Sequence, residues 1–330
     1  MALLQQAGLG HVRVLHRGRN ARTRAQESQV SVIEARRPVS DSRQPAYTRP
    51  EAGEVLDKMI ATEPQAHEQP VAEAPAFPWK LWIYTNYDCN LRCRYCVAKS
   101  SPNAPRRAIG LANVQRLIDE STQLGFVHAF FTGGEPFLLP DIYDMLAYSS
   151  ARMQTTVLTN AMLLHGTRLE KLVAIADDRL IVQVSLDGGR PEDHDAYRGA
   201  GSWARAVEGI RQLQAHGFRV RLGTTETPVN SAHLQQLCEF HRSLGIPDED
   251  HFVRPLARRG YSREGLVLSM ANLVPEVTVN LDGVFWHPLS TDADMQVSKK
   301  MFPLAPAVAR IQRQLEFMAR TGSVPLLEFK

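Results

Sequence analysis

Along residues 80–254, the spacing of apolar residues alternates between two kinds, and this alternation predicts the fold. Short apolar runs of strand length recur, and between them lie longer segments whose apolar residues are three and four positions apart. The expected strands are 81–84, 127–131, 155–158, 180–185, 218–224 and 251–254. The expected helices are 111–124, 140–150, 167–176, 203–216 and 231–244. Repeated strand–helix units predict an α/β fold with a parallel sheet and helices outside it, and these units fit a partial (β/α)6 TIM-like barrel.

The segments on either side of this pattern differ from it. Residues 1–26 are rich in arginine and contain no acidic residue, which is typical of a transit peptide, a disordered basic tail or an over-extended gene start. Pro, Ala and Glu dominate residues 38–78, so we expect 1–76 to be a disordered tail and linker, with one short helix near 51–61. The folded core is then expected at 77–256.

A small α+β extension is expected at 257–330. Leu281-Asp282-Gly283 separates two apolar runs, which predicts a hairpin over 276–288. Apolar residues at helical spacing predict a final helix over 303–320.

Composition narrows the class of protein. Of the 330 residues, 44% are hydrophobic and 22% charged, as in globular proteins. The net charge of +3 is too small to indicate a nucleic-acid partner, and no apolar run has the ~18 residues that a membrane span needs. Four cysteines, three of them in one short segment, favour a metal site in a reducing compartment over a disulfide framework, so we expect a cytoplasmic protein.

The clustered cysteines follow the first predicted strand. Cys89, Cys93 and Cys96 are spaced C-x3-C-x2-C, and Tyr95 precedes the last of them. Cys238 lies far away in a helical apolar pattern, where we expect a buried small hydrophobic residue and not a ligand. Iron–sulfur cubanes normally have four cysteine ligands, so three thiolates without a fourth indicate a cluster with one iron open for a small molecule.

Other unusual turns follow the later strands. They are Gly133-Gly134-Glu135-Pro136, Thr159-Asn160, Ser185-Leu186-Asp187-Gly188 and Gly223-Thr224-Thr225-Glu226. In barrels of parallel strands, the loops at the C-terminal strand ends form the site, so these turns and the cysteine loop should share one rim. Arg254, Arg258 and Arg259 follow the sixth strand near the same rim, where they either hold an anion or are simply solvated.

The cysteine motif and the Gly-Gly-Glu-Pro turn, in this order after the first two strands, resemble the radical S-adenosylmethionine (radical SAM) superfamily over residues 79–255. The resemblance implies one [4Fe-4S] cluster on Cys89, Cys93 and Cys96, with SAM completing the fourth iron. It implies reductive cleavage of SAM to a 5′-deoxyadenosyl radical, which abstracts hydrogen from a substrate. It also implies an external electron donor such as flavodoxin or ferredoxin.

The resemblance further implies a set of SAM contacts. Gly133 and Gly134 would let backbone carbonyls approach the SAM ammonium group, and Glu135 would add a charge-assisted hydrogen bond. Tyr95 would pack beside the cluster and the adenine, and Ser185 would contact SAM. The alternatives are an ordinary strand-to-helix turn, a core aromatic residue and a turn serine. Two further residues, Arg198 and Arg205, remain open as partners of the SAM carboxylate.

The kind of substrate is left open between two classes. Residues 192–199 resemble the segment after strand four in peptide-modifying and sulfatase-maturing radical SAM enzymes, which favours a peptide. The region after the hairpin turn reads Trp286-His287-Pro288 and lacks the cysteines of SPASM or Twitch auxiliary clusters, which favours a small metabolite. Whether His287 or Asp292 touches a substrate is undecided. Two other classes remain as alternatives: a catalytically silent radical SAM-like scaffold and a non-catalytic metal-binding module.

Overall fold

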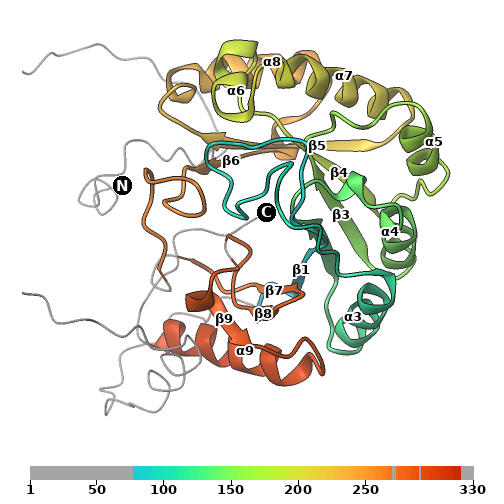
Figure 1. Ribbon diagram of the computed structural model, residues 1–330, viewed down its shortest axis with the longest axis vertical. Coiled ribbons are helices and arrows are strands. Elements are labelled where there is room, and N and C mark those ends of the chain that lie inside the picture. The colour runs from blue at the N-terminus through green and yellow to red at the C-terminus, as the bar shows by residue number, and fades with distance from the viewer. Residues whose placement is uncertain (1–76, 270–272, 290, 321–330) are drawn as a thin grey trace, which may run out of the picture. The chain divides into compact units, whose positions relative to one another are not determined.

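The computed structural model describes residues 77–269, 273–289 and 291–320. In these ranges the strands form one nine-stranded sheet in the order β6-β5-β4-β3-β2-β1-β7-β8-β9 (Figure 1). The first six strands are parallel and lie in chain order. They are β1 (Lys80–Tyr84), β2 (His128–Thr132), β3 (Gln154–Thr159), β4 (Leu180–Ser185), β5 (Arg219–Glu226) and β6 (His251–Pro255). The predicted partial (β/α)6 barrel is therefore confirmed.

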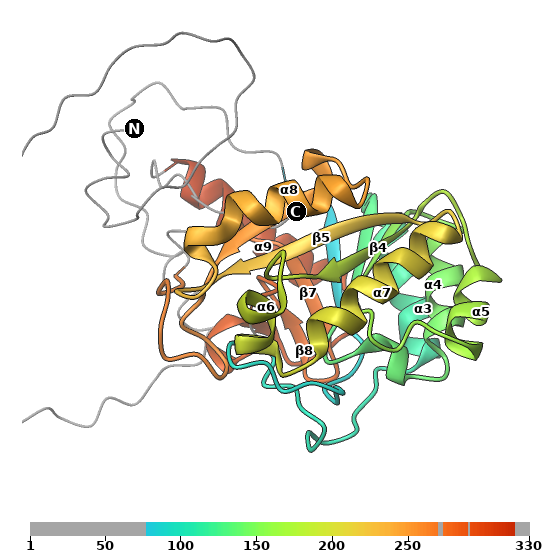
Figure 2. The same cartoon turned by 90° about the horizontal axis from the view of Figure 1, so that it is seen from above.

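Helices connect successive strands and cover the outer side of the curved sheet (Figures 1 and 2). They are α3 (Leu111–Gln123), α4 (Ile142–Ser150), α5 (Thr167–Val173), α6 (Pro191–Arg198), α7 (Ser202–Ala215) and α8 (Leu234–Ser243). Helix α3 illustrates why they form. It buries Val114, Leu117 and Ile118 on one face, the predicted stripe, and Gly125 follows it at a φ of 92°.

The strands alternate between two apolar layers. Leu81 and Ile83 of β1 belong to the large core under the outer helices. Trp82, between them, points to the other face and stacks on Phe130 of β2, with ring centroids 4.2 Å apart. Both faces of these strands are therefore buried, as expected for parallel strands inside an α/β fold.

The C-terminal segment extends the sheet beyond β1. Strand β7 (Val277–Asn280) pairs with β1 in parallel, and β8 (Gly283–Phe285) returns antiparallel to it, which confirms the predicted hairpin. Strand β9 (Gln296–Ser298) and helix α9 (Ala305–Arg320) follow. The indole of Trp82 donates a 2.5 Å hydrogen bond to Glu276, and the hydroxyl of Tyr84 donates one of 2.6 Å to the carbonyl of Pro288. Buried polar contacts therefore join the hairpin region to β1.

Two local expectations need correction. The second strand runs from His128 to Thr132, one residue later than expected, and Val127 is 64% exposed, so the apolar run begins before the buried part of the strand. Helix α6 was not predicted, since its acidic residues give no apolar stripe, although Pro191 at its start and the following acidic pair are helix-start signals. The predictions for residues 1–76 lie outside the described residues. None of the described helices is both long and apolar enough to cross a membrane.

Candidate functional site

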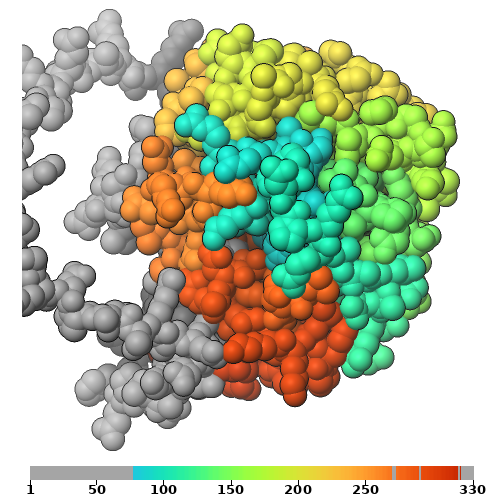
Figure 3. Space-filling view, viewed as in Figure 1, coloured from blue at the N-terminus to red at the C-terminus, as the bar shows by residue number. Residues whose placement is uncertain are grey.

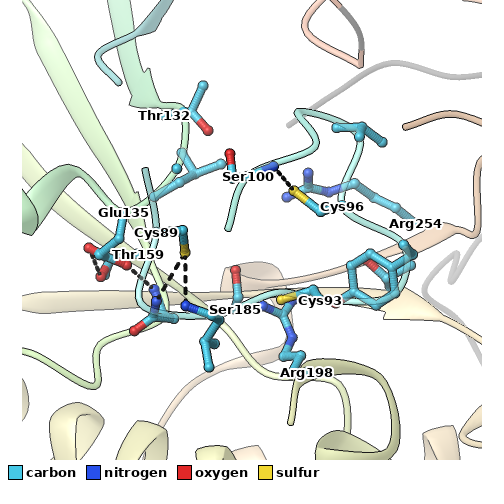
Figure 4. A pocket seen from close by; sticks show the side chains of 18 of the residues that line it. Cys89, Cys93, Cys96, Ser100, Thr132, Glu135, Thr159, Ser185, Arg198 and Arg254 are labelled. Atoms are coloured by element: carbon cyan, nitrogen blue, oxygen red, sulfur yellow. Dashed lines mark hydrogen bonds between the residues drawn. The ribbon is translucent and has the colours of Figure 1, made fainter. Parts of the chain in front are cut away.

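A cavity opens at the C-terminal ends of the parallel strands, and all the predicted site residues line it (Figure 4). These residues are Cys89, Cys93, Tyr95, Cys96, Gly133, Gly134, Glu135 and Ser185. The sequence predicts that their turns share one rim but gives no distances between them. The fold brings them together because parallel neighbours end at the same edge of the sheet.

The loop that carries the cysteines is held at both ends by backbone contacts. At its start, the amide of Cys89 donates to the carbonyl of Ser101 over 3.2 Å. At its end, the amide of Tyr261 donates to the carbonyl of Cys96 over 3.1 Å, and a Cβ on Gly260 would lie 2.0 Å from that same carbonyl. Figure 3 shows this part of the chain, in cyan, at the surface between the yellow helical side and the orange C-terminal segment. The loop is thus clamped from a segment more than 150 residues later.

The two glycines of the Gly-Gly-Glu-Pro turn permit contact with the start of the cysteine loop. A Cβ on Gly133 would lie 2.3 Å from the carbonyl oxygen of Asn86, and one on Gly134 would lie 2.0 Å from that of Asp88. The amide of Gly134 donates to Asn86 over 2.9 Å, and the amide of Glu135 donates to Asp88 over 3.0 Å. No side chain fits at either glycine without moving the backbone of the loop. This turn therefore helps to place the cysteines.

The side chain of Glu135 is buried and ties the turn after β2 to the end of β3. Its Oε1 accepts from the hydroxyl of Thr159 over 2.8 Å and from the amide of Phe137 over 3.2 Å, and its Oε2 accepts from the amide of Asn160 over 2.9 Å. Burial raises the pKa of Glu135 to about 7, although all three hydrogen bonds favour the carboxylate. The group therefore titrates near neutral pH.

Asp187 joins three elements behind the cavity, and sequence reasoning had treated it only as a turn residue. Its carboxylate accepts from Nε of Arg198 over 2.7 Å, from the amide of Thr225 over 2.9 Å and from the hydroxyl of Tyr95. Burial alone would raise the pKa of Asp187, but the guanidinium of Arg198 holds it below the usual range. Burial also raises the pKa of Tyr95, which therefore stays a phenol and a hydrogen-bond donor. The aromatic residue of the cysteine motif is thus fixed from the opposite strands.

The chain matches a known family over nearly half of its length. The family model of the radical SAM superfamily matches residues 83–240. This matched part of the chain is called the radical SAM domain. The match covers the cysteine loop, the Gly-Gly-Glu-Pro turn, Ser185 and Asp187.

The chain is also similar to individual curated proteins over about half of its length. It is 31% identical over 179 residues to an AdoMet-dependent heme synthase of Methanosarcina barkeri, which covers 53% of this chain and 51% of that protein. It is 34% identical over 184 residues to the mycofactocin maturase MftC of Mycobacterium ulcerans, and this alignment covers 54% of this chain and 47% of MftC. The antilisterial bacteriocin subtilosin biosynthesis protein AlbA of Bacillus subtilis is 31% identical over 159 residues, and this alignment covers 48% of this chain and 35% of AlbA. The chain thus spans about half the length of the first two relatives.

Among solved structures, SuiB of Streptococcus suis bound to S-adenosylmethionine aligns with a TM-score of 0.51. It is 21% identical, and the alignment covers 59% of this chain and 45% of SuiB. At this identity the likeness supports the fold of the radical SAM domain.

The radical SAM family uses a [4Fe-4S] cluster and SAM, and the sulfurs of this cavity suit such a group. Backbone amides face two of them: that of Leu91 lies 3.4 Å from Sγ of Cys89, and that of Ser100 lies 3.3 Å from Sγ of Cys96. Burial raises the pKa of Cys89 to about 12 and that of Cys93 to about 11. Without a metal these thiols are protonated at pH 7, so binding an iron–sulfur cluster must release their protons.

Two arginines bring positive charge to the cavity. Arg198 and Arg254 both line the cavity, whereas Arg205 does not line it and donates to the carbonyl of Met162 over 3.3 Å. Burial lowers the pKa of Arg254 to about 10, so it remains charged at pH 7. Of the two arginines that sequence reasoning left open, Arg198 is therefore the one at the site. The cavity suits anionic thiolates and a carboxylate.

Arg259, which belongs to the same predicted basic group as Arg254, makes different contacts. Arg259 pairs with Asp294 over 2.7 Å and with Asp292 over 3.3 Å, which binds it to the segment before β9. His287, whose contact with a substrate the sequence leaves undecided, is fully buried and does not line the cavity. Arg254 is thus the basic residue of this group that lines the cavity, and the sequence signal for it was its position at the end of a strand.

Proposed function

We propose that this chain is a radical SAM enzyme that abstracts hydrogen from a peptide substrate. The observation that carries the proposal is that the three cysteines of the motif, Arg198, Arg254 and the Gly-Gly-Glu turn line one cavity, most of whose residues lie in the part of the chain that matches the radical SAM family. Cys89, Cys93 and Cys96 would hold a [4Fe-4S] cluster. When bound, the cluster and SAM supply reductive cleavage of the sulfonium C–S bond, which yields methionine and a 5′-deoxyadenosyl radical.

The charged residues of the chain prepare the cavity for that chemistry. Arg198 and Arg254 offset the negative charge of the thiolates, and the amides of Leu91 and Ser100 donate to two of the sulfurs. Asp187 holds Arg198 in place through a buried ion pair and offsets part of its charge.

The polar and the apolar residues that line the cavity have separate roles. Gly133, Gly134 and Glu135 would accept from the ammonium group of SAM, and Ser185 and Tyr95 would position its adenosyl part. Apolar side chains at the cavity exclude water, which protects a carbon radical from side reactions. They are Leu91, Val97, Leu158, Leu256 and Leu289.

The peptide substrate is supported by two relatives whose names describe maturation or bacteriocin biosynthesis. The alternative is a small-molecule substrate, which the similarity to an AdoMet-dependent heme synthase supports. An electron donor such as flavodoxin or ferredoxin would supply the reducing equivalent.

Metal analysis and electron paramagnetic resonance test the cluster. After anaerobic reconstitution, the full chain should contain about four iron and four sulfide ions, and SAM should change the spectrum of the reduced cluster. Cys93→Ala should lose the iron, whereas Cys238→Ala should retain it. Iron retained in full by Cys93→Ala would contradict the assignment of the cysteines.

A further inference from the structure

A second group of metal-ligating side chains lies away from the cavity, between α8 and β6. Cys238 and His241 are three positions apart on one face of α8, and His251 is the first residue of β6. The sulfur and one nitrogen of each ring all lie within 4.8 Å of one another. The sequence predicts a buried small hydrophobic residue at Cys238, but its side chain is partly exposed and its Sγ lies 3.9 Å from Nδ1 of His251.

Hydrogen bonds fix which nitrogen of His251 carries the proton. The hydroxyl of Thr224 donates to the carbonyl of Leu186 over 2.6 Å, so its oxygen is left to accept from the ring. Nε2 of His251 lies 2.8 Å from that oxygen and therefore donates to it. The neutral ring then presents the lone pair of Nδ1 toward Cys238.

A hydrogen bond also determines which nitrogen of His241 carries the proton. Its Nδ1 lies 2.8 Å from the carbonyl oxygen of Ile246, which can only accept, so Nδ1 carries the proton. Nε2 then has a lone pair. His241 is 0% exposed, and its Nε2 has no hydrogen-bond partner within the described ranges. Oδ1 of Asp248 is 3.7 Å away, beyond hydrogen-bond distance. A buried acceptor without a partner costs free energy that a bound cation would recover.

We propose that Cys238 Sγ, His241 Nε2 and His251 Nδ1 bind a Zn²⁺ ion. One thiolate and two imidazoles are the ligand types that zinc prefers, and a tetrahedral ion separates a sulfur and a nitrogen ligand by about 3.5 Å, close to the observed spacing. Both histidines already donate their other N–H, to Ile246 and to Thr224, as metal-ligating histidines do. Water or Oδ1 of Asp248 completes the coordination.

The zinc site is separate from the cluster site. None of its three ligands lines the cavity, and His251 begins β6, whereas Arg254 and Pro255 line the cavity at the other end of that strand. The ion would cross-link α8 to β6 and stabilise their contact. This inference does not depend on the proposed radical chemistry.

Metal analysis of the reconstituted full chain tests the proposal. The protein should contain about one Zn²⁺ in addition to its iron, and the zinc X-ray absorption edge should report one sulfur at about 2.3 Å together with nitrogen or oxygen ligands. Cys238→Ser and His251→Gln should lose most of the zinc and keep the iron. His216→Gln, at an exposed histidine, is the matched control and should keep both metals.

Failure of the zinc proposal can be distinguished from failure of the cluster assignment, because the zinc content reports the first and the iron content reports the second. Zinc that stays in Cys238→Ser and His251→Gln, or zinc with several sulfur ligands, would place the ion on the cysteine loop and overturn the proposal. A wild-type protein with its iron in place that takes up no zinc in a direct Zn²⁺ titration would overturn it as well.

Discussion

Arg198 and Asp187 form a buried ion pair, with Nε of the arginine 2.7 Å from Oδ2 of the aspartate and side-chain exposures of 9% and 0%. Asp187→Asn keeps the shape but leaves the guanidinium buried without its counter-charge. Such a change should lower the free energy of unfolding by about 3–5 kcal/mol. Urea denaturation of the protein without metal measures this directly.

A surface pair gives the control for that prediction. Arg107 and Asp282 lie 2.6 Å apart, but their side chains are about half exposed at 46% and 50%. Asp282→Asn should change the free energy of unfolding by at most about 1 kcal/mol. Equal effects of the two substitutions would mean that the Asp187 pair is not buried in the folded protein.

SAM affinity should separate the two arginines that sequence alone left open. Arg198 lines the cavity, and Arg205 does not. Lysine keeps the charge but not the planar fork, so Arg198→Lys should weaken SAM binding by about tenfold or more, and Arg205→Lys should leave it unchanged. Equilibrium titration of the reconstituted protein with SAM measures both. The reverse ranking would reject Arg198 as the SAM contact.

Glu135 should give the stability a distinct pH dependence. Its folded pKa of about 7 lies above its ordinary value of 4.5, so the folded state holds a proton that the unfolded state releases between these two values. Its contribution to stability therefore falls as the pH rises through this window, by up to about 1.4 kcal/mol per pH unit. Glu135→Gln should remove that slope.

The measurement is the difference between wild type and Glu135→Gln in urea unfolding at several pH values from 4.5 to 8. Buried histidines such as His194, whose pKa burial lowers to about 4, act in the opposite direction but equally in both proteins. A difference that is independent of pH would show that Glu135 is ionised throughout.

Gly134→Ala should disturb the cysteine loop without touching a cysteine. The added Cβ would lie 2.0 Å from the carbonyl oxygen of Asp88, so the loop must shift, and we expect iron uptake on reconstitution to fall several-fold. Gly217→Ala is the control, because it has a positive φ of 78° but open space around its Cβ. It should cost some stability and leave iron uptake unchanged, and iron loss in both variants would instead point to general destabilisation.

Much of the fold could be predicted because it depends on local patterns. Apolar periodicity located each strand of β1 to β6, and Asp282-Gly283 located the hairpin. Periodicity could not locate α6, whose stripe is polar. Nor could it place β7 beside β1, because the register of Leu81 with Val277 joins positions almost 200 residues apart.

The candidate site was likewise predictable only where it depends on local sequence. The cysteine spacing and the glycine turn are contiguous in sequence, and they were found. The contacts of Asp187 with Tyr95, Arg198 and Thr225 were missed, because they form only when separate strands end at one rim. The pairing of Cys238 with His251 was missed for a similar reason, since a loop separates the helix from the strand.

The most direct test of the radical SAM assignment is the formation of 5′-deoxyadenosine. The reconstituted chain, reduced with dithionite and given SAM without oxygen, should release 5′-deoxyadenosine and methionine, and Cys93→Ala should release neither. Cys238→Ala should retain the activity, because its sulfur lies outside the cavity. A fully loaded cluster that cleaves no SAM, with candidate peptides and small molecules present, would contradict the account.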